Sequence, residues 1–242
     1  MFKTYKLIAF YVLLILTPFL QSCGGGGGGG SDGPMFTVSK SEIFFGAAVG
    51  GSQPASQTIS GTVTNYSGVL YIFIIQTANG INTIMQPVIQ GNAGIATVVA
   101  QNPAIGQGRY LDTITVLACS DSACNNQLSG SPRIISVSYV IGIVAEPSNL
   151  SFSVVAGMAP PSQTLTIYHY QGNQNWASSF LFHSGSGWMT YSPASGQTPT
   201  TVTVNVSAMP ATASGSVFDA EIRLGANAGA DSVTVPISYA VN

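Results

Sequence analysis

The sequence predicts an all-β protein in which two tandem sandwich domains follow a signal peptide and a flexible glycine-rich tether. Apolar and polar residues alternate over short runs, and clusters of Gly, Pro, Asn and Ser separate those runs. The strand pattern also returns about 100 residues further along the chain, which is the length of one sandwich domain. No segment after residue 34 carries the apolar stripe of an amphipathic helix.

Nine runs alternate clearly enough to be expected as strands. Branched and aromatic residues dominate them, as is typical of residues that pack on a half-buried sheet. The runs cover residues 58–63, 68–75, 95–100, 110–118, 134–141, 164–168, 201–206, 218–224 and 232–241.

Two pairs of matching segments define the repeat. Residues 108–112 (GRYLD) match residues 215–219 (GSVFD) at an offset of 107, whereas the closing segments 137–139 (VSY) and 237–239 (ISY) match at an offset of 100. The first copy is therefore longer between these two pairs, where two cysteines lie. We expect one domain over residues 35–144 and a second over residues 145–242.

The boundary between the copies has almost no linker. Pro147 restricts its own backbone and favours an extended Glu146, which predicts a fairly stiff tandem rod on a flexible stalk.

The first 22 residues have the three parts of an export signal. Lys3 and Lys6 precede an apolar stretch over residues 7–20, and small or polar residues follow it. The stretch contains Pro18 and is shorter than the roughly 20 residues that a membrane-spanning helix needs. Cleavage before Cys23 is therefore expected; a plain signal peptide and an uncleaved anchor are the alternatives.

The segment L-Q-S-C, which ends at Cys23, resembles the lipid-attachment box of bacterial lipoproteins. The resemblance implies that Cys23 becomes the amino terminus, carries diacylglycerol on sulfur and a palmitate-type acyl chain on nitrogen, and binds the bilayer. Residues 23–34 contain seven consecutive glycines, a composition that predicts an unfolded tether. In the same family, Gly24 instead of aspartate implies the outer membrane, on its periplasmic or its cell-surface face.

Charge argues against nucleic acid as a partner. Only Lys40, Arg109, Arg133 and Arg223 are basic after residue 22, and they form no cluster. Such a weakly charged, hydroxyl-rich and amide-rich chain is common among secreted β proteins.

Cys119 and Cys124 remain once Cys23 is assigned to lipid. An even number of cysteines in an exported chain predicts a disulfide, here at the base of a protruding hairpin, with free thiols as the alternative. Two sulfurs without a nearby histidine do not provide the four ligands of a closed zinc site, and no metal or other cofactor is expected.

Residues 145–242 contain P-S-N-L-S-F-S, S-Q-T-L-T-I, G-W-M-T-Y-S-P-A-S-G and P-T-T-V-T-V-N-V, and this region resembles a BACON-type immunoglobulin-like domain. Residues 35–144 share only its opening and closing strands. The resemblance implies a bacterial extracytoplasmic module, often appended to polysaccharide-processing proteins, for which carbohydrate or mucin binding has been proposed. The chain departs from the family in lacking an attached catalytic domain and the frequent terminal glutamine.

Aromatic residues are the candidate ligand-binding groups. Tyr168, Tyr170 and Trp176 lie in the polar segment Y-H-Y-Q-G-N-Q-N-W, where exposed rings could stack on sugars. Trp188 alternates with its neighbours in the family motif and is expected in the core.

The remaining polar candidates are interpreted as structural residues or as residues of the surface and loops. His169 and His183 lack the spacing of a metal site or a catalytic triad and are expected on the surface or in loops. Asp112 and Asp219 occupy matching places in the two copies, so a structural role near a strand start is expected for them.

Together these observations favour a non-enzymatic, membrane-anchored lipoprotein that presents immunoglobulin-like domains for adhesion or for envelope or extracellular interactions. The alternative is a carbohydrate-binding module for glycan or mucin. The sequence leaves the oligomeric state open.

Overall fold

The computed structural model describes residues 5–10, 33–210, 213–226 and 230–242, and for residues 5–10 it describes the backbone alone. Cys23 and residues 24–32 of the tether lie outside the described residues, so lipidation stays a prediction. Among the described residues, no helix is long and apolar enough to cross a membrane.

The chain divides into two compact units. Unit 1 consists of Met1–Phe44, Pro54–Asn102 and Tyr110–Ser138. Unit 2 consists of Phe45–Gln53, Pro103–Arg109 and Tyr139–Asn242.

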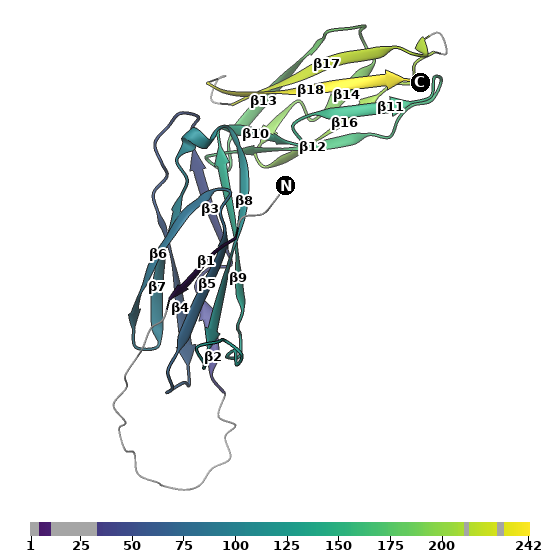
Figure 1. The fold of residues 1–242 in the computed structure, drawn as a ribbon. Coiled ribbons are helices and arrows are strands. Elements are labelled where there is room, and N and C mark those ends of the chain that lie inside the picture. Colours follow the sequence, from purple (N-terminus) through teal and green to yellow (C-terminus); the bar gives the residue numbers. More distant parts are fainter. Residues whose placement is uncertain (1–4, 11–32, 211–212, 227–229) are drawn as a thin grey trace, which may run out of the picture. The chain divides into compact units, whose positions relative to one another are not determined.

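Unit 1 is built on two β-sheets (Figure 1). The first sheet contains, in spatial order, β2 (Met35–Val38), β4 (Gln57–Thr64), β7 (Ala93–Ala100) and β6 (Ile81–Gln90). The second contains β1 (Tyr5–Phe10), β5 (Tyr71–Thr77), β8 (Gly108–Cys119), β9 (Arg133–Ile141) and β3 (Glu42–Ala47). A short 3-10 helix, η1 (Pro103–Ile105), precedes β8 and belongs to unit 2.

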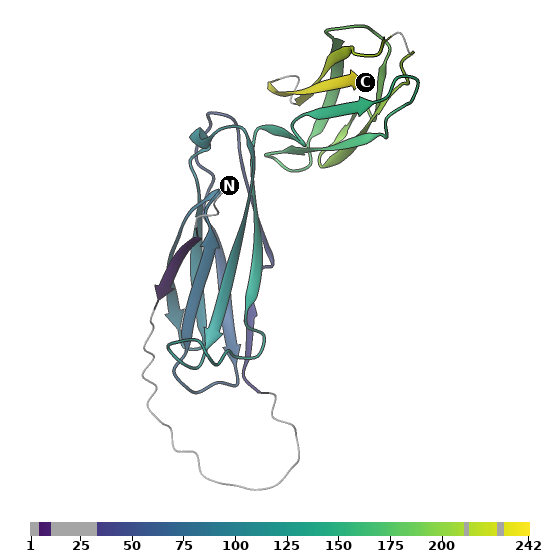
Figure 2. The same cartoon turned by 45° about the vertical axis from the view of Figure 1, so that its right-hand side comes forward.

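Unit 2 has the same kind of architecture. One sheet contains β10 (Ile143–Glu146), β12 (Gln163–His169), β16 (Thr200–Val206) and β14 (Met189–Ser192). The other contains β11 (Leu150–Val154), β18 (Asp231–Val241), β17 (Val217–Ala226), β13 (Asn175–Phe182) and β15 (Ser195–Gln197). Figure 2 shows these two layers from a second direction.

The strand orders are those of an immunoglobulin-like sandwich. The order β2-β4-β7-β6 in unit 1 corresponds to β10-β12-β16-β14 in unit 2, and the order β5-β8-β9-β3 corresponds to β13-β17-β18-β11. Consecutive strands thus divide between two facing sheets, as in immunoglobulin-like sandwiches. The all-β, immunoglobulin-like fold class is therefore confirmed. Eight of the nine expected runs lie within observed strands, and the run 68–75 overlaps β5 from Tyr71 onward. The strand β1 forms inside the segment expected to be a signal peptide.

The core of unit 2 is rich in aromatic residues. Trp188 is 2% exposed, and its Nε1 donates a hydrogen bond to the Ser184 carbonyl oxygen at 3.0 Å. Its ring lies 5.4 Å from the ring of Phe182 and 5.8 Å from that of Tyr239. Such ring pairs add about 0.5–1.5 kcal/mol to the stabilisation from burial. The expected core position of Trp188 is confirmed.

The core of unit 1 is mainly aliphatic and contains a cavity. Phe36, Ile59, Ile74 and Ile114 are buried, and together with other apolar residues they line a cavity of about 50 Å³. A gap of this size removes van der Waals partners from the side chains around it, so it reduces the stabilisation that packing gives this core.

Candidate functional site

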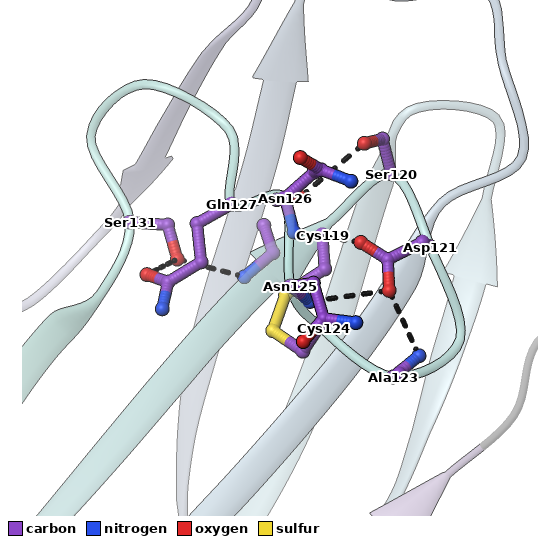
Figure 3. Close-up of a disulfide and its surroundings, with 10 residues drawn as sticks. Cys119, Ser120, Asp121, Ala123, Cys124, Asn125, Asn126, Gln127 and Ser131 are labelled. Carbon is purple, nitrogen blue, oxygen red and sulfur yellow. Dashed lines mark hydrogen bonds between the residues drawn. A yellow bond between two sulfur atoms is a disulfide. The ribbon is translucent and has the colours of Figure 1, made fainter.

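The disulfide between Cys119 and Cys124 is confirmed (Figure 3). Cys119 is the buried last residue of β8, and the two Cα atoms lie 5.1 Å apart, inside the usual range. The bond does not staple the base of a hairpin, because the residue across from Cys119 is Gln127. It closes a small loop beyond that bridge, which we call the cysteine loop (residues 119–126).

The Asp121 carboxylate organises the backbone of the cysteine loop (Figure 3). It accepts hydrogen bonds from the backbone N–H groups of Ala123 at 3.0 Å, Asn125 at 3.1 Å and Asn126 at 2.7 Å. The N–H groups of Asn125 and Asn126 are the main reason that the pKa of Asp121 lies below its ordinary value, since they stabilise the charged carboxylate. Cys124 adopts a φ of 56°, a left-handed conformation that this network and the disulfide hold in place.

The far side of the same connection is attached to β2. Leu128 is 7% exposed, and its N–H donates to the Ala118 carbonyl oxygen at 2.9 Å. The N–H of Phe36 donates to the Ser129 carbonyl oxygen at 2.7 Å. Both ends of the cysteine loop are therefore fixed to strands, although its tip faces solvent.

The tip of the cysteine loop presents small polar groups. The exposed residues are Ser120, Ser122, Ala123, Asn125 and Asn126. Hydroxyl and amide groups both donate and accept hydrogen bonds, so this tip can bind a polar ligand without first becoming ordered. The sequence indicated the disulfide here but not the carboxylate network, for which Asp121 followed by small and amide residues was the available signal.

The structure does not bring the three sugar-binding candidates together. Trp176 is 3% exposed and belongs to the core of unit 2, so the expectation of a loop tryptophan that stacks on sugars was wrong. The physical reason is that β13 starts at Asn175, which makes Trp176 an inward-facing strand residue. Its indole Nε1 has no hydrogen-bond partner among the described residues.

Tyr168 and Tyr170 are half-buried residues at the end of β12 and just after it. The Arg109 guanidinium lies 4.1 Å from the centre of the Tyr168 ring, and Arg109 also pairs with Glu146 at 2.9 Å. A cation occupies this ring face, so the face is not available for stacking on a sugar. Tyr170 packs its ring 4.5 Å from that of His169.

His169 is buried, which contradicts the expectation of a surface or loop residue. It is 1% exposed, and its Nε2 lies 3.2 Å from Oδ2 of Asp231. Its Nδ1 accepts a hydrogen bond from the Gln171 N–H at 3.1 Å, which places the proton of a neutral ring on Nε2, directed at Asp231. The Nε2 atom thus links the end of β12 to the start of β18, and the Nδ1 atom holds the turn that follows β12.

His183 lies at the surface of unit 2, with half of its side chain exposed. Its Nε2 is 3.2 Å from Glu221 Oε2. The pKa of Glu221 is lowered first by hydrogen bonding to Arg223 and then by hydrogen bonding to His183. Across the described residues, no group of three or more His, Cys, Asp or Glu side chains is arranged to hold a metal ion.

Asp112 has the structural role expected for it. Its buried carboxylate accepts hydrogen bonds from Thr77 Oγ1 at 2.6 Å and from the N–H groups of Asn79 at 2.8 Å, Gly80 at 2.6 Å and Ile81 at 2.9 Å. It therefore fixes the turn between β5 and β6. Its counterpart Asp219 is exposed, and its contacts to the neighbouring connection use backbone groups.

Comparisons with known proteins give distant matches. No protein-family model matches the chain, and a search of curated proteins also finds no match. Among solved structures, the D00-D0 domain of intimin is similar with 14% identity, 85% of this chain and 98% of its own covered, and a TM-score of 0.33. A protein of unknown function from Porphyromonas gingivalis shows 9% identity, 85% and 99% coverage and a TM-score of 0.30.

An endo-fucoidan hydrolase from glycoside hydrolase family 107, MfFcnA4, is similar over 92% of this chain with 14% identity and a TM-score of 0.31. This chain covers 30% of that enzyme's length.

Proposed function

We propose that this chain is a non-enzymatic bacterial lipoprotein, anchored in the outer membrane through acylated Cys23, that presents two immunoglobulin-like domains for adhesion or for envelope or extracellular interactions. The observation that carries the proposal is the junction L-Q-S-C followed directly by seven glycines, placed just ahead of β2 in the first sandwich. An acylated residue on such a tether keeps a folded β unit at a membrane while leaving it free to reorient. The BACON-type resemblance of the second domain is compatible with this extracytoplasmic role.

The cysteine loop is the proposed contact surface. An ordered polar tip loses little conformational entropy on binding, which favours recognition by hydrogen bonds. The alternative, a carbohydrate-binding module, rests on the BACON-type resemblance and on the aromatic segment around Trp176. Since Trp176 is in the core, the resemblance alone still supports this alternative.

The anchor is tested by changing Cys23→Ala, with Ser22→Ala as the matched control. In a bacterial host grown with a palmitate analogue, we expect the Cys23→Ala chain to lose both the label and its membrane association, while Ser22→Ala keeps both. Label retained on the Cys23→Ala chain would falsify the lipid attachment.

The contact surface is tested with cells that display the chain and are offered immobilised glycans and extracellular proteins. We expect Asp121→Ala to weaken adhesion at least tenfold, because the loop loses its ordering carboxylate, whereas Asp219→Ala leaves adhesion unchanged. Equal adhesion by the two variants would show that the contact surface lies outside the cysteine loop. Binding to glycans alone would favour the carbohydrate-binding alternative.

A further inference from the structure

In the sheet β1-β5-β8-β9-β3, the strand β1 is at the edge and β5 is next to it. On its inner side β5 pairs with β8 from Tyr71 to Gln76. On its outer side it pairs antiparallel with β1, the strand drawn in dark purple in Figures 1 and 2. β5 reads Y-I-F-I-I-Q-T and contains neither a charged residue nor a proline.

The strand β1 lies inside the segment that the proposed lipoprotein processing removes. The inference that follows therefore rests on the proposed function. Cleavage before Cys23 takes residues 5–10 away and opens the backbone of β5. Proteins rarely leave a long, apolar and uncharged edge strand uncovered, because its free N–H and C=O groups pair with other strands. The chain offers no Lys, Pro or bulge on β5 to prevent this.

The strand that covers β5 in this structure resembles β5 itself. β1 reads Y-K-L-I-A-F and β5 begins Y-I-F-I-I-Q, so tyrosine, a large apolar residue and isoleucine occupy the same first, third and fourth places. The register places Tyr5 opposite Thr77 and Ile8 opposite Ile74. If β5 of a second copy replaced β1 in this register, its Tyr71 would lie opposite Thr77 and its Ile74 would lie opposite Ile74.

That register is compatible with two-fold symmetry, as is any antiparallel register of two identical strands. In an antiparallel pair of identical strands, the residue on the symmetry axis faces itself and all other residues face each other reciprocally. Here Ile74 lies on the axis, and Phe73 of each copy faces Ile75 of the other.

We propose that the open edge of β5 pairs with β5 of a second copy of this chain, forming a two-fold symmetric dimer at the membrane. Ile72 and Ile74 line the apolar cavity of unit 1, while Tyr71, Phe73 and Ile75 are half-buried on the opposite face. Pairing therefore extends the sheet and joins apolar surfaces on both of its faces. One strand pair buries less area than a stable soluble dimer needs, and confinement of both copies by their lipid anchors raises their effective concentration.

The test uses the full-length chain expressed in a bacterial host and kept in its membranes. Opposed residues of an antiparallel pair have Cα atoms about 4.5–5.5 Å apart, which a disulfide can bridge. We expect Ile74→Cys to give a disulfide-linked dimer under mild oxidation. Ile72→Cys, on the same face but two residues from the axis, is the control and should give at least tenfold less. Equal crosslinking at both positions, or none at position 74, would overturn the proposed register.

A second pair of variants tests the edge without added cysteines. Ile75→Lys places a charge on the edge strand, and Thr115→Lys places the same charge on the same face of β8, one strand further in. In amine crosslinking of membranes we expect Ile75→Lys to lose the dimer and Thr115→Lys to keep it. A dimer that survives in both variants contradicts pairing through β5.

Intact mass separates failure of this inference from failure of the proposed function. A chain that has lost its leader and carries acyl mass supports the anchor, and if it is then monomeric in the membrane only the dimer is refuted. A chain that retains residues 1–22 contradicts the anchor. If such a chain also forms the position-74 crosslink, β1 does not cover β5, and the leader's role as the competing strand is refuted.

Discussion

Unit 1 and unit 2 share their strand order but differ in three local features: a strand connection, the covering of an edge strand and the filling of the core. The strands β8 and β9 of unit 1 are joined by residues 120–132 with the cysteine loop, whereas β17 and β18 are joined by residues 227–230. The strand β5 is covered by β1, which lies in the expected signal peptide, whereas its counterpart β13 is covered in part by β15 (Ser195–Gln197). The interior of unit 1 has a cavity, while that of unit 2 is filled by aromatic rings. The repeated topology sets the scaffold, and the features suited to contacts with other molecules gather in unit 1.

The largest effect should come from the aromatic core of unit 2. Trp188→Ala removes a ring that is 2% exposed, and we expect it to lower the free energy of unfolding of unit 2 by about 4 kcal/mol. Both tryptophans of the chain lie in unit 2, so denaturant unfolding followed by the remaining Trp176 fluorescence reports on that unit. Hydrogen exchange of unit 1 peptides should stay unchanged. A loss below about 1 kcal/mol would mean that Trp188 is not a core residue.

The second largest effect is expected at Asp112, whose removal should cost much more stability than removal of its counterpart Asp219. Asp112→Ala leaves three backbone N–H groups and the Thr77 hydroxyl without their acceptor, and we expect a loss of about 3 kcal/mol in unit 1. Asp219→Ala removes an exposed side chain and should change the stability of unit 2 by less than about 0.5 kcal/mol. Hydrogen exchange of the β5–β6 turn and of β17 measures both. Similar losses from the two variants would mean that the copies use this position in the same way.

The sequence was sufficient where the information is local or periodic. Alternation located the nine runs, and the repeat located the longer connection with its two cysteines. Trp188 was correctly assigned because it lies in an alternating segment. The strand β13 was missed because its sequence N-W-A-S-S-F-L-F does not alternate cleanly and the polar residues just before Trp176 suggested a loop.

The features that were missed depend on partners distant in the chain. His169 is buried because it meets Asp231, which is 62 residues away. The sequence around His169 contains no pattern that predicts this contact. The pairing of β1 with β5 is equally invisible, since an export signal is apolar for reasons unrelated to strand pairing.

Opening the disulfide should have an intermediate effect confined to unit 1. Closing a loop with a separation of 5 residues lowers the entropy of the unfolded chain by an amount equivalent to about 2 kcal/mol at room temperature. We expect Cys119→Ser with Cys124→Ser to lose about this much stability in unit 1. Reductant should destabilise the unmodified unit 1 similarly and leave unit 2, which has no cysteine, unchanged. Equal sensitivity of both units would show that the bond stabilises more than its own loop.

The smallest expected effect is a difference in how salt changes two lowered pKa values, that of Asp121 in unit 1 and that of Glu221 in unit 2. Each is lowered in the folded state, so each favours folding at pH above its unfolded value, and this contribution is lost as pH falls through the folded value. Asp121 is held mainly by backbone N–H groups, whereas Glu221 is held first by Arg223 and then by His183. Salt screens exposed ion pairs more than fixed backbone hydrogen bonds. In carboxyl-detected NMR titrations, raising NaCl to about 1 M should therefore return the pKa of Glu221 toward its ordinary value and leave that of Asp121 low. An equal response of both would mean that charge, and not the loop backbone, determines the state of Asp121.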